Sequence, residues 1–254
     1  MNNLEKLFAG KKGGLFMAHM IAGCPTMEES EKVAEALVKG GADIIELQIP
    51  FSDPMADGPA IAVASEEAIK GGATVAKSLA LLEKVARLGK PVAVMTYLNI
   101  PFRYGISKFV TKIAKTGASA LIVPDCPFDT EEGRELLTAC KETQVYLIPV
   151  VSPGVPKERL EQLATDASGF VYCTSRQGIT GANSKFAKEL VDFVKELKEI
   201  FKLPIAVGFG VKSKEDVAEL AKVADIVIAG SFFIHVIKTS SPGSVEKSLK
   251  SLIS

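Results

Sequence analysis

Two carboxylates, Glu46 and Asp57, are the side chains whose type and spacing suggest chemistry. Glu46 stands within the apolar run 42–49 (ADIIELQI), which alternates as a strand does. The residues on either side of Glu46 form an all-apolar face that should pack on helices, so Glu46 is expected to turn into the core. Burial raises the pKa of a carboxyl group, which suits a general acid/base near neutral pH. These residues leave open a structural glutamate that satisfies backbone amides.

The loop 50–59 (PFSDPMADGP) supplies the second carboxylate. It is long enough to fold back and bring Asp57 over the end of the strand that holds Glu46. Asp53 stands next to Pro54, and a plain turn residue is as good an interpretation of it as any role in the chemistry. Asp57, which is followed by a glycine, also fits a plain turn. Two carboxylates in one site would permit acid/base chemistry.

Alternating apolar runs and amphipathic stretches provide the scaffold for these side chains. Strands are predicted at 14–23, 42–49, 91–97, 119–125, 145–151, 169–175, 204–210 and 225–231. Helices are predicted at 27–40, 74–89, 107–117, 130–142, 157–166, 185–201, 213–223 and 244–253, with an extra helix at 4–10 that plugs the bottom. Strict alternation over 254 residues predicts one α/β domain, 1–254, folded as a (β/α)8 TIM barrel rather than a doubly wound sheet.

In such a barrel the active site lies at the C-terminal ends of the strands. Tyr97 and Tyr172 stand near the ends of the third and sixth predicted strands. Glycines after the last two strands would let backbone amides approach a phosphate, and this predicted site comprises Gly210, Gly230 and Ser231. The stretch 175–184 (SRQGITGANS) is predicted to be a lid, with Gly181 as a third phosphate contact.

Composition and missing motifs argue against several classes of function. Lys plus Arg and Asp plus Glu balance at 30 each, so neither nucleic acid nor an anionic membrane is indicated as a partner. No predicted strand end carries a lysine, which disfavours a Schiff-base aldolase. The two histidines, His19 and His235, have no cluster of acidic or thiol ligands, so no metal is expected. Four scattered cysteines, no CxxC pair, no signal peptide and no long apolar run indicate a cytoplasmic protein.

Several stretches together resemble the alpha subunit of tryptophan synthase, nearly from end to end. They are ELQIPFSDPMADGPAI, MTYLN, IVPDCPFDTEE, YCTSRQGITG, VGFGVKS and AGSFF. That family splits indole-3-glycerol phosphate into indole and glyceraldehyde 3-phosphate by a retro-aldol reaction. The resemblance therefore implies a carbon–carbon lyase of tryptophan biosynthesis. It also implies a beta subunit as partner in an α2β2 heterotetramer, with pyridoxal phosphate (PLP) only in that partner and no cofactor in this chain.

The resemblance also implies roles for individual residues. Glu46 would handle the proton transfers, and Asp57 would accept a hydrogen bond from the indole N–H and stabilise positive charge on the ring. Thr180 would bond Asp57 when the lid closes, and Asp53 would meet the beta subunit. The substrate pocket would be lined by Tyr172, Phe209, Ile61, Met95, Tyr97 and Thr180. The phosphate would be held by Gly181, Gly210, Gly230 and Ser231.

Three positions depart from the family pattern. Gln48 stands where glycine is usual, His19 where an aromatic or apolar residue is common, and Ile21 where threonine is usual. Two other readings stay open: a stand-alone lyase that releases indole, or a catalytically weak subunit kept as an allosteric partner of the beta subunit. Another phosphate-binding barrel, such as a sugar-phosphate isomerase, would fit the glycines but would leave the loop 50–59 unexplained.

Overall fold

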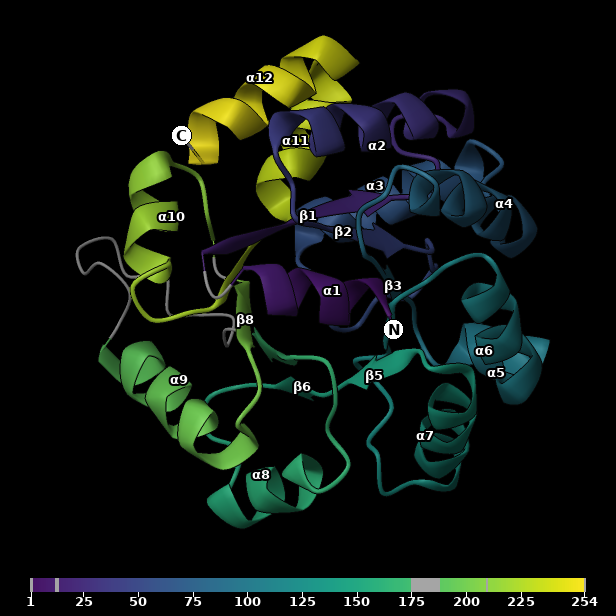
Figure 1. The fold of residues 1–254 in the computed structure, drawn as a ribbon. Coiled ribbons are helices and arrows are strands. Elements are labelled where there is room, and N and C mark those ends of the chain that lie inside the picture. The colour runs from purple at the N-terminus through teal and green to yellow at the C-terminus, as the bar shows by residue number, and fades with distance from the viewer. Residues whose placement is uncertain (1, 12–13, 175–187, 209, 254) are drawn as a thin grey trace.

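The structure is a computed structural model that describes residues 2–11, 14–174, 188–208 and 210–253. Its centre is a sheet rolled into a barrel, with helices around the outside (Figure 1). The strands are β1 (Leu15–Ile21), β2 (Ile44–Gln48), β3 (Val92–Met95), β4 (Ala120–Ile122), β5 (Tyr146–Ile148), β6 (Val150–Val151), β7 (Val171–Thr174), β8 (Ile205–Gly208) and β9 (Ile226–Ala229). Their order is β5-β4-β3-β2-β1-β9-β8-β7-β6, and every pair is parallel. The predicted α/β barrel is confirmed.

The barrel closes at Pro149, which divides the predicted fifth strand into β5 and β6. β5 pairs with β4, whereas β6 pairs with β7 on the other side. Pro149 has no N–H to donate, but its carbonyl accepts the backbone N–H of Tyr172 at 2.9 Å. One predicted strand is therefore two short strands, and together they join the two ends of the sheet.

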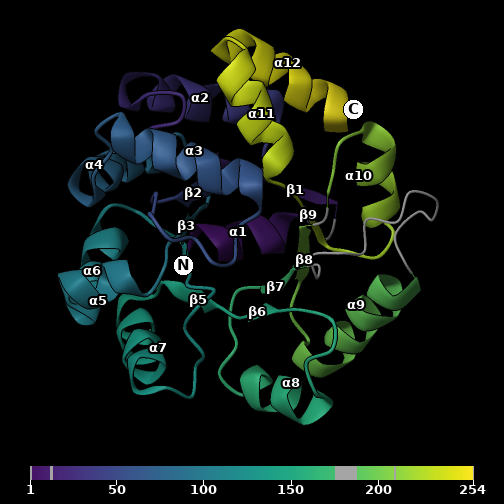
Figure 2. The same cartoon turned by 180° about the vertical axis from the view of Figure 1, so that it is seen from behind.

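Apart from α1, the helices of the described residues cover the outside of the barrel, and Figure 2 shows the same ring from behind. The described helices are α1 (Asn3–Gly10), α2 (Met27–Gly40), α3 (Pro59–Lys70), α4 (Val75–Ala86), α5 (Asn99–Tyr104), α6 (Ile106–Lys115), α7 (Glu131–Thr143), α8 (Lys157–Ala164), α9 (Lys188–Phe201), α10 (Lys214–Leu220), α11 (Ser231–Thr239) and α12 (Pro242–Ile253). The sequence patterns do not predict α3, α5 or α11. The buried side chains of α3 are small and α5 has 6 residues, so neither shows a strong amphipathic stripe. Helix α11 does bury an apolar stripe, which was overlooked; it comprises Phe233, Ile234, Val236 and Ile237.

Alternation along each strand divides the apolar core into two layers. Met17 and Ile44 belong to the layer inside the barrel. Ile45 and Leu47 belong to the layer between the strands and the helices. Glu46 lies between these two outward-facing residues in the sequence, and it therefore points into the barrel, as predicted.

Helix α1 plugs one end of the barrel, as predicted, and crosses its centre in Figure 1. Its Leu4 is fully buried in the inner layer. Asn2 caps the helix by accepting the N–H of Leu4 at 2.9 Å, and its Nδ2 donates to the carbonyls of Ser119 and Gln144 at 2.8 Å each. Ser119 and Gln144 lie just before β4 and β5, so α1 covers the N-terminal ends of the strands. The C-terminal ends are left for a site.

Candidate active site

Glu46 lies in the middle of β2 and is 2% exposed. It is in register with His19 on β1 and with Ala93 on β3. His19 is 3% exposed, and its Nδ1 lies 3.0 Å from Glu46 Oε2. The geometry of this contact does not fit a hydrogen bond, so the two groups form an ion pair when His19 is protonated. The predicted general acid/base is therefore buried beside a basic side chain.

The charge of His19 depends on two opposing effects. Burial disfavours the imidazolium form. The charge of Glu46, its close polar contact with the imidazole and the charge of Asp57 favour that form and together outweigh burial, so the pKa of His19 is raised above its usual value of 6.5. The site therefore favours a cation beside its two carboxylates.

Asp57 reaches the site from the loop that follows β2, which folds back as predicted. Gln48 Nε2 donates a hydrogen bond to Asp57 Oδ2 at 2.7 Å. Two further contacts shape the loop: the N–H of Asp57 donates to the carbonyl of Pro54 at 3.2 Å, and the N–H of Ala56 donates to the hydroxyl of Tyr97 at 3.1 Å. The loop is thus held at the ends of both β2 and β3.

The protonation of Asp57 responds to the same neighbours. Burial raises the pKa of Asp57, while the hydrogen bond from Gln48, the charge of His19 and the Tyr97 hydroxyl pull it down. Burial wins, so Asp57 holds its proton more tightly than an aspartate in water. The electrostatic influence of Glu46 raises the pKa of Asp57 further. Glu46, His19 and Asp57 are therefore one coupled group.

Two tyrosines border this group from opposite sides. Tyr97 follows β3, is 1% exposed and stacks on Phe51, with ring centroids 5.4 Å apart and an interplanar angle of 26°. Tyr172 lies on β7, across the barrel from β2 in the strand order. Burial and the charges of Glu46 and Asp57 raise the pKa of Tyr172. The two carboxylates therefore act across the width of the barrel.

Met95 and Ile61, predicted as apolar walls, lie beside the same region. Met95 is in register with Gln48 and belongs to the inner layer of the core. Ile61 lies on α3, and its Cδ1 would be 3.5 Å from a Cβ built on Gly230. Ile61 therefore connects the helix after the acidic loop with the predicted phosphate site.

Three of the four predicted phosphate residues lie at the ends of β8 and β9. Gly230 is the N-cap of α11 and Ser231 is its first residue, and no side chain caps this helix within the described part of the chain. First-turn amides of a helix suit an anion. Gly210 has a φ of +49°, a left-handed conformation that favours glycine.

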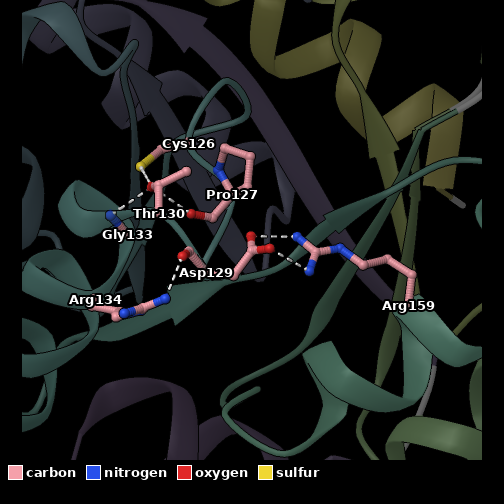
Figure 3. Close-up of polar contacts among 7 residues, drawn as sticks. All are labelled: Cys126, Pro127, Asp129, Thr130, Gly133, Arg134 and Arg159. Atoms are coloured by element: carbon pink, nitrogen blue, oxygen red, sulfur yellow. Dashed lines mark hydrogen bonds and ion pairs between the residues drawn. The ribbon is translucent and has the colours of Figure 1, made fainter.

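The rim beside this site is fixed by contacts after β4 (Figure 3). Asp129 forms a two-pronged ion pair with Arg159 of α8, with nitrogen–oxygen distances of 2.6 and 2.8 Å. Thr130 caps α7 by accepting the N–H of Gly133 at 3.0 Å and donating to the carbonyl of Pro127 at 2.9 Å. A Cβ on Gly133 would lie 2.1 Å from the oxygen of Pro127, so only glycine fits there. These contacts join the loop after β4 to α7 and α8.

Several predicted site residues lie outside the described part of the chain, and one is exposed. Phe209, Thr180, Gly181 and the predicted lid 175–184 lie outside the described residues, and their roles stay predictions. Asp53 is exposed on the acidic loop. The sequence alone did not predict the contacts of His19 and Gln48 with the two carboxylates.

The described residues also bear on metals and membranes. Residues 2–11, 14–174, 188–208 and 210–253 contain no group of three or more His, Cys, Asp or Glu side chains that could hold a metal ion. None of the described helices combines the length and the apolar character that a membrane crossing needs. The four cysteines are free and buried, and they are Cys24, Cys126, Cys140 and Cys173.

A parallel barrel that holds two coupled carboxylates toward the C-terminal ends of its strands has the arrangement of a barrel enzyme with acid/base chemistry. The sequence model of the family described as tryptophan synthase alpha chain matches residues 6–253. The chain belongs to that family. Its predicted function is confirmed: a lyase of tryptophan biosynthesis that cleaves indole-3-glycerol phosphate and works with a beta subunit.

Individual relatives cover nearly the whole barrel. The tryptophan synthase alpha chain of Desulforapulum autotrophicum is 40% identical over 239 residues, or 94% of each chain. That of Desulfotalea psychrophila is 38% identical over 253 residues, covering 98% of this chain and 99% of the relative. Tryptophan synthase from M. tuberculosis, in an open form, superimposes with a TM-score of 0.88 at 31% identity over 99% of this chain and 95% of that one. The alpha subunit from Campylobacter jejuni gives 0.86 at 36% identity, over 97% and 98%.

Proposed function

We propose that Glu46 and Asp57 carry out the cleavage of indole-3-glycerol phosphate in this chain. The observation that carries this proposal is the burial of Glu46 inside the barrel, with Asp57 bound at 2.7 Å by Gln48 of the same strand. Glu46 gives a proton to C3 of the indole ring and takes a proton from the glycerol hydroxyl. Asp57 accepts a hydrogen bond from the ring N–H.

The reaction needs these two functions at separate places. Protonation at C3 creates an indolenine with positive charge at the ring nitrogen. The bond between C3 and the glycerol carbon then breaks, its electrons return to the ring, and the hydroxyl proton leaves as the aldehyde forms. A carboxylate beside the ring nitrogen stabilises the cation, and a second one exchanges the protons. The proton taken from the hydroxyl replaces the one given to C3, so Glu46 ends as it began.

The pocket and the phosphate site follow from the same arrangement. Tyr97, Tyr172, Met95 and Ile61 enclose the indole ring, an apolar ligand that these side chains suit. The phosphate is held by Gly210, Gly230 and Ser231, and the uncapped first turn of α11 supports this assignment. Phe209, Thr180 and Gly181 complete the proposed set.

We also propose the cofactor requirement, the assembly with the beta subunit and the cellular compartment of this chain. The cleavage uses no cofactor or metal in this chain, because Glu46 supplies its proton transfers and Asp57 stabilises its charge, and PLP is expected only in the beta subunit. Asp53, exposed at the rim, contacts that subunit in an α2β2 heterotetramer. Four free buried thiols suit the reducing cytoplasm. Residues 1–254 act as one catalytic domain, which the single sheet of the described residues supports.

The test replaces Glu46 by glutamine, which keeps the shape of the side chain and removes its proton transfer. We expect Glu46→Gln to lose about 10²–10⁴-fold in indole release while it still binds a substrate analogue. Glu66→Gln is the matched control, because Glu66 is an exposed glutamate of α3. Wild-type turnover by Glu46→Gln would overturn the assignment.

The same assay separates the three readings of the subunit's role. Indole release is measured with the isolated chain and with added beta subunit. Strong release that the beta subunit does not change indicates a stand-alone lyase. Weak release that rises on addition supports the synthase subunit, and no release under either condition indicates an allosteric partner alone.

A further inference from the structure

His19 and Glu46 are two polar side chains in a layer of the barrel that is otherwise largely apolar. Their Cα atoms are in register across β1 and β2, and both residues are at most 3% exposed. Met17 and Ile44 precede His19 and Glu46 by two residues on the same strands. They are also in register and belong to the apolar inner layer. A buried carboxylate needs a compensating partner. His19 is the basic group within reach of Glu46, at 3.0 Å.

The contact involves one particular nitrogen of the imidazole. Nδ1 faces Glu46 Oε2, and within the described residues Nε2 has no hydrogen-bond partner. The nitrogen that carries the proton of a histidine is set by the groups that its two nitrogens face. Glu46 therefore favours the proton on Nδ1.

The other charged and titratable groups around His19 act in the same direction. From β2 and its loop, Glu46 and Asp57 both favour the imidazolium, against burial. From β9, the residues in register with β1 are Ile226, Val227, Ile228 and Ala229, none of which titrates. Burial, together with the same two carboxylates, raises the pKa of Tyr172 on β7, so its hydroxyl adds no charge beside His19. The groups around His19 thus favour its cationic form.

We propose that His19 is a positioning residue for Glu46: its imidazole stores, on Nδ1, the proton that Glu46 delivers to the substrate. This inference rests on the proposed role of Glu46. It places the stored proton of the resting state on His19 Nδ1. When substrate binding aligns this contact into a hydrogen bond, the proton moves from Nδ1 to Oε2, and Glu46 passes it to C3 of the indole ring. The ionised Glu46 then takes the hydroxyl proton and returns it to Nδ1, so protons balance over one turnover.

A residue that only fills space would leave the pH dependence unchanged. If His19 stores the proton, activity falls at high pH as His19 loses it. In His19→Gln the proton must sit on Glu46 itself, and a carboxyl group releases its proton at lower pH than an imidazolium that is paired with carboxylates. We therefore expect the alkaline limb of kcat/KM to move to lower pH by about one unit or more in His19→Gln.

The experiment has an activity arm and a titration arm. The first compares normalised pH profiles of the parent, His19→Gln and His19→Phe, the last of which keeps a large side chain in the wall. The second follows the His19 imidazole by NMR in a His235→Gln background, which leaves one histidine in the chain. His19 should titrate at lower pH after Glu46→Gln, and in the parent its pKa should match the alkaline limb.

The outcomes separate this inference from the proposed function. Superimposable profiles for parent and His19 variants, or an NMR pKa of His19 that Glu46→Gln does not change, would overturn the proton-storing role. Either result, combined with an inactive Glu46→Gln, would leave the proposed function standing. The titration arm needs no folded His19 variant, so it decides the matter even if both variants fail to fold.

Discussion

Gln48 Nε2 and Asp57 Oδ2 are joined by a hydrogen bond of 2.7 Å, and this bond links the strand that carries Glu46 with the loop above it. The amide therefore occupies one lone pair of the carboxylate that we assign to the indole N–H. A carboxylate has room for further donors, so the amide and the ring can both bind. Gln48 acts as a fixed donor that orients Asp57 before the substrate arrives.

Removal of Gln48 should change the protonation of Asp57. The hydrogen bond lowers the pKa of Asp57 against the raising effect of burial. In Gln48→Ala that opposition is lost, so the pKa of Asp57 rises and its ionised form appears only at higher pH. We expect the acid limb of kcat/KM to shift to higher pH, as measured by initial rates of indole release. An acid limb identical to that of the parent would show that Gln48 does not control Asp57.

The pairing of His19 predicts a pH-dependent stability. The folded-state pKa of His19 is raised, so its contribution to the free energy of unfolding is fully present below its unfolded pKa. This contribution is lost as pH rises through the folded pKa. The difference in unfolding free energy between the parent and His19→Phe should therefore shrink from about pH 6 to about pH 9. Urea unfolding at both values measures it, and a constant difference would contradict the pairing.

Asp53 should matter for the partner rather than for the chemistry. It is exposed on the loop that also carries Asp57, so docking there can bias where Asp57 sits. We expect Asp53→Ala to keep the basal rate of the isolated chain and to lose stimulation by the beta subunit. A titration with beta subunit measures this, and Asp129→Ala is a control from another loop of the rim. Full stimulation of Asp53→Ala would remove this residue from the coupling.

Much of the fold was predictable because apolar residues recur with different periods in strands and in helices. Runs such as 42–49 alternate, and the stripe of α2 recurs every three or four residues, so both elements were identified. The split at Pro149 was not predicted, because it depends on which neighbour each half of the strand meets. The short helix α5 lacks the pattern on which such predictions rest.

The site was predictable in part, for the same physical reason. Alternation within β2 was enough to turn Glu46 inward. The contact between His19 and Glu46 depends on the register of β1 against β2, which a single sequence does not specify. The position of Asp57 depends on Gln48 and on the Tyr97 hydroxyl, which is 41 residues away from its Ala56 partner. Contacts between elements were therefore the part that sequence reasoning missed.

The most direct test of the central claim follows the proton at C3 of the ring. Indole is incubated in D2O with the protein and glycerol 3-phosphate, which occupies the phosphate site, and the C3–H signal is followed by NMR. If Glu46 protonates C3, the parent protein and Glu66→Gln both accelerate the loss of this signal. With Glu46→Gln, the signal is lost only as fast as it is without any protein. Exchange by Glu46→Gln at the rate of the parent would contradict the account.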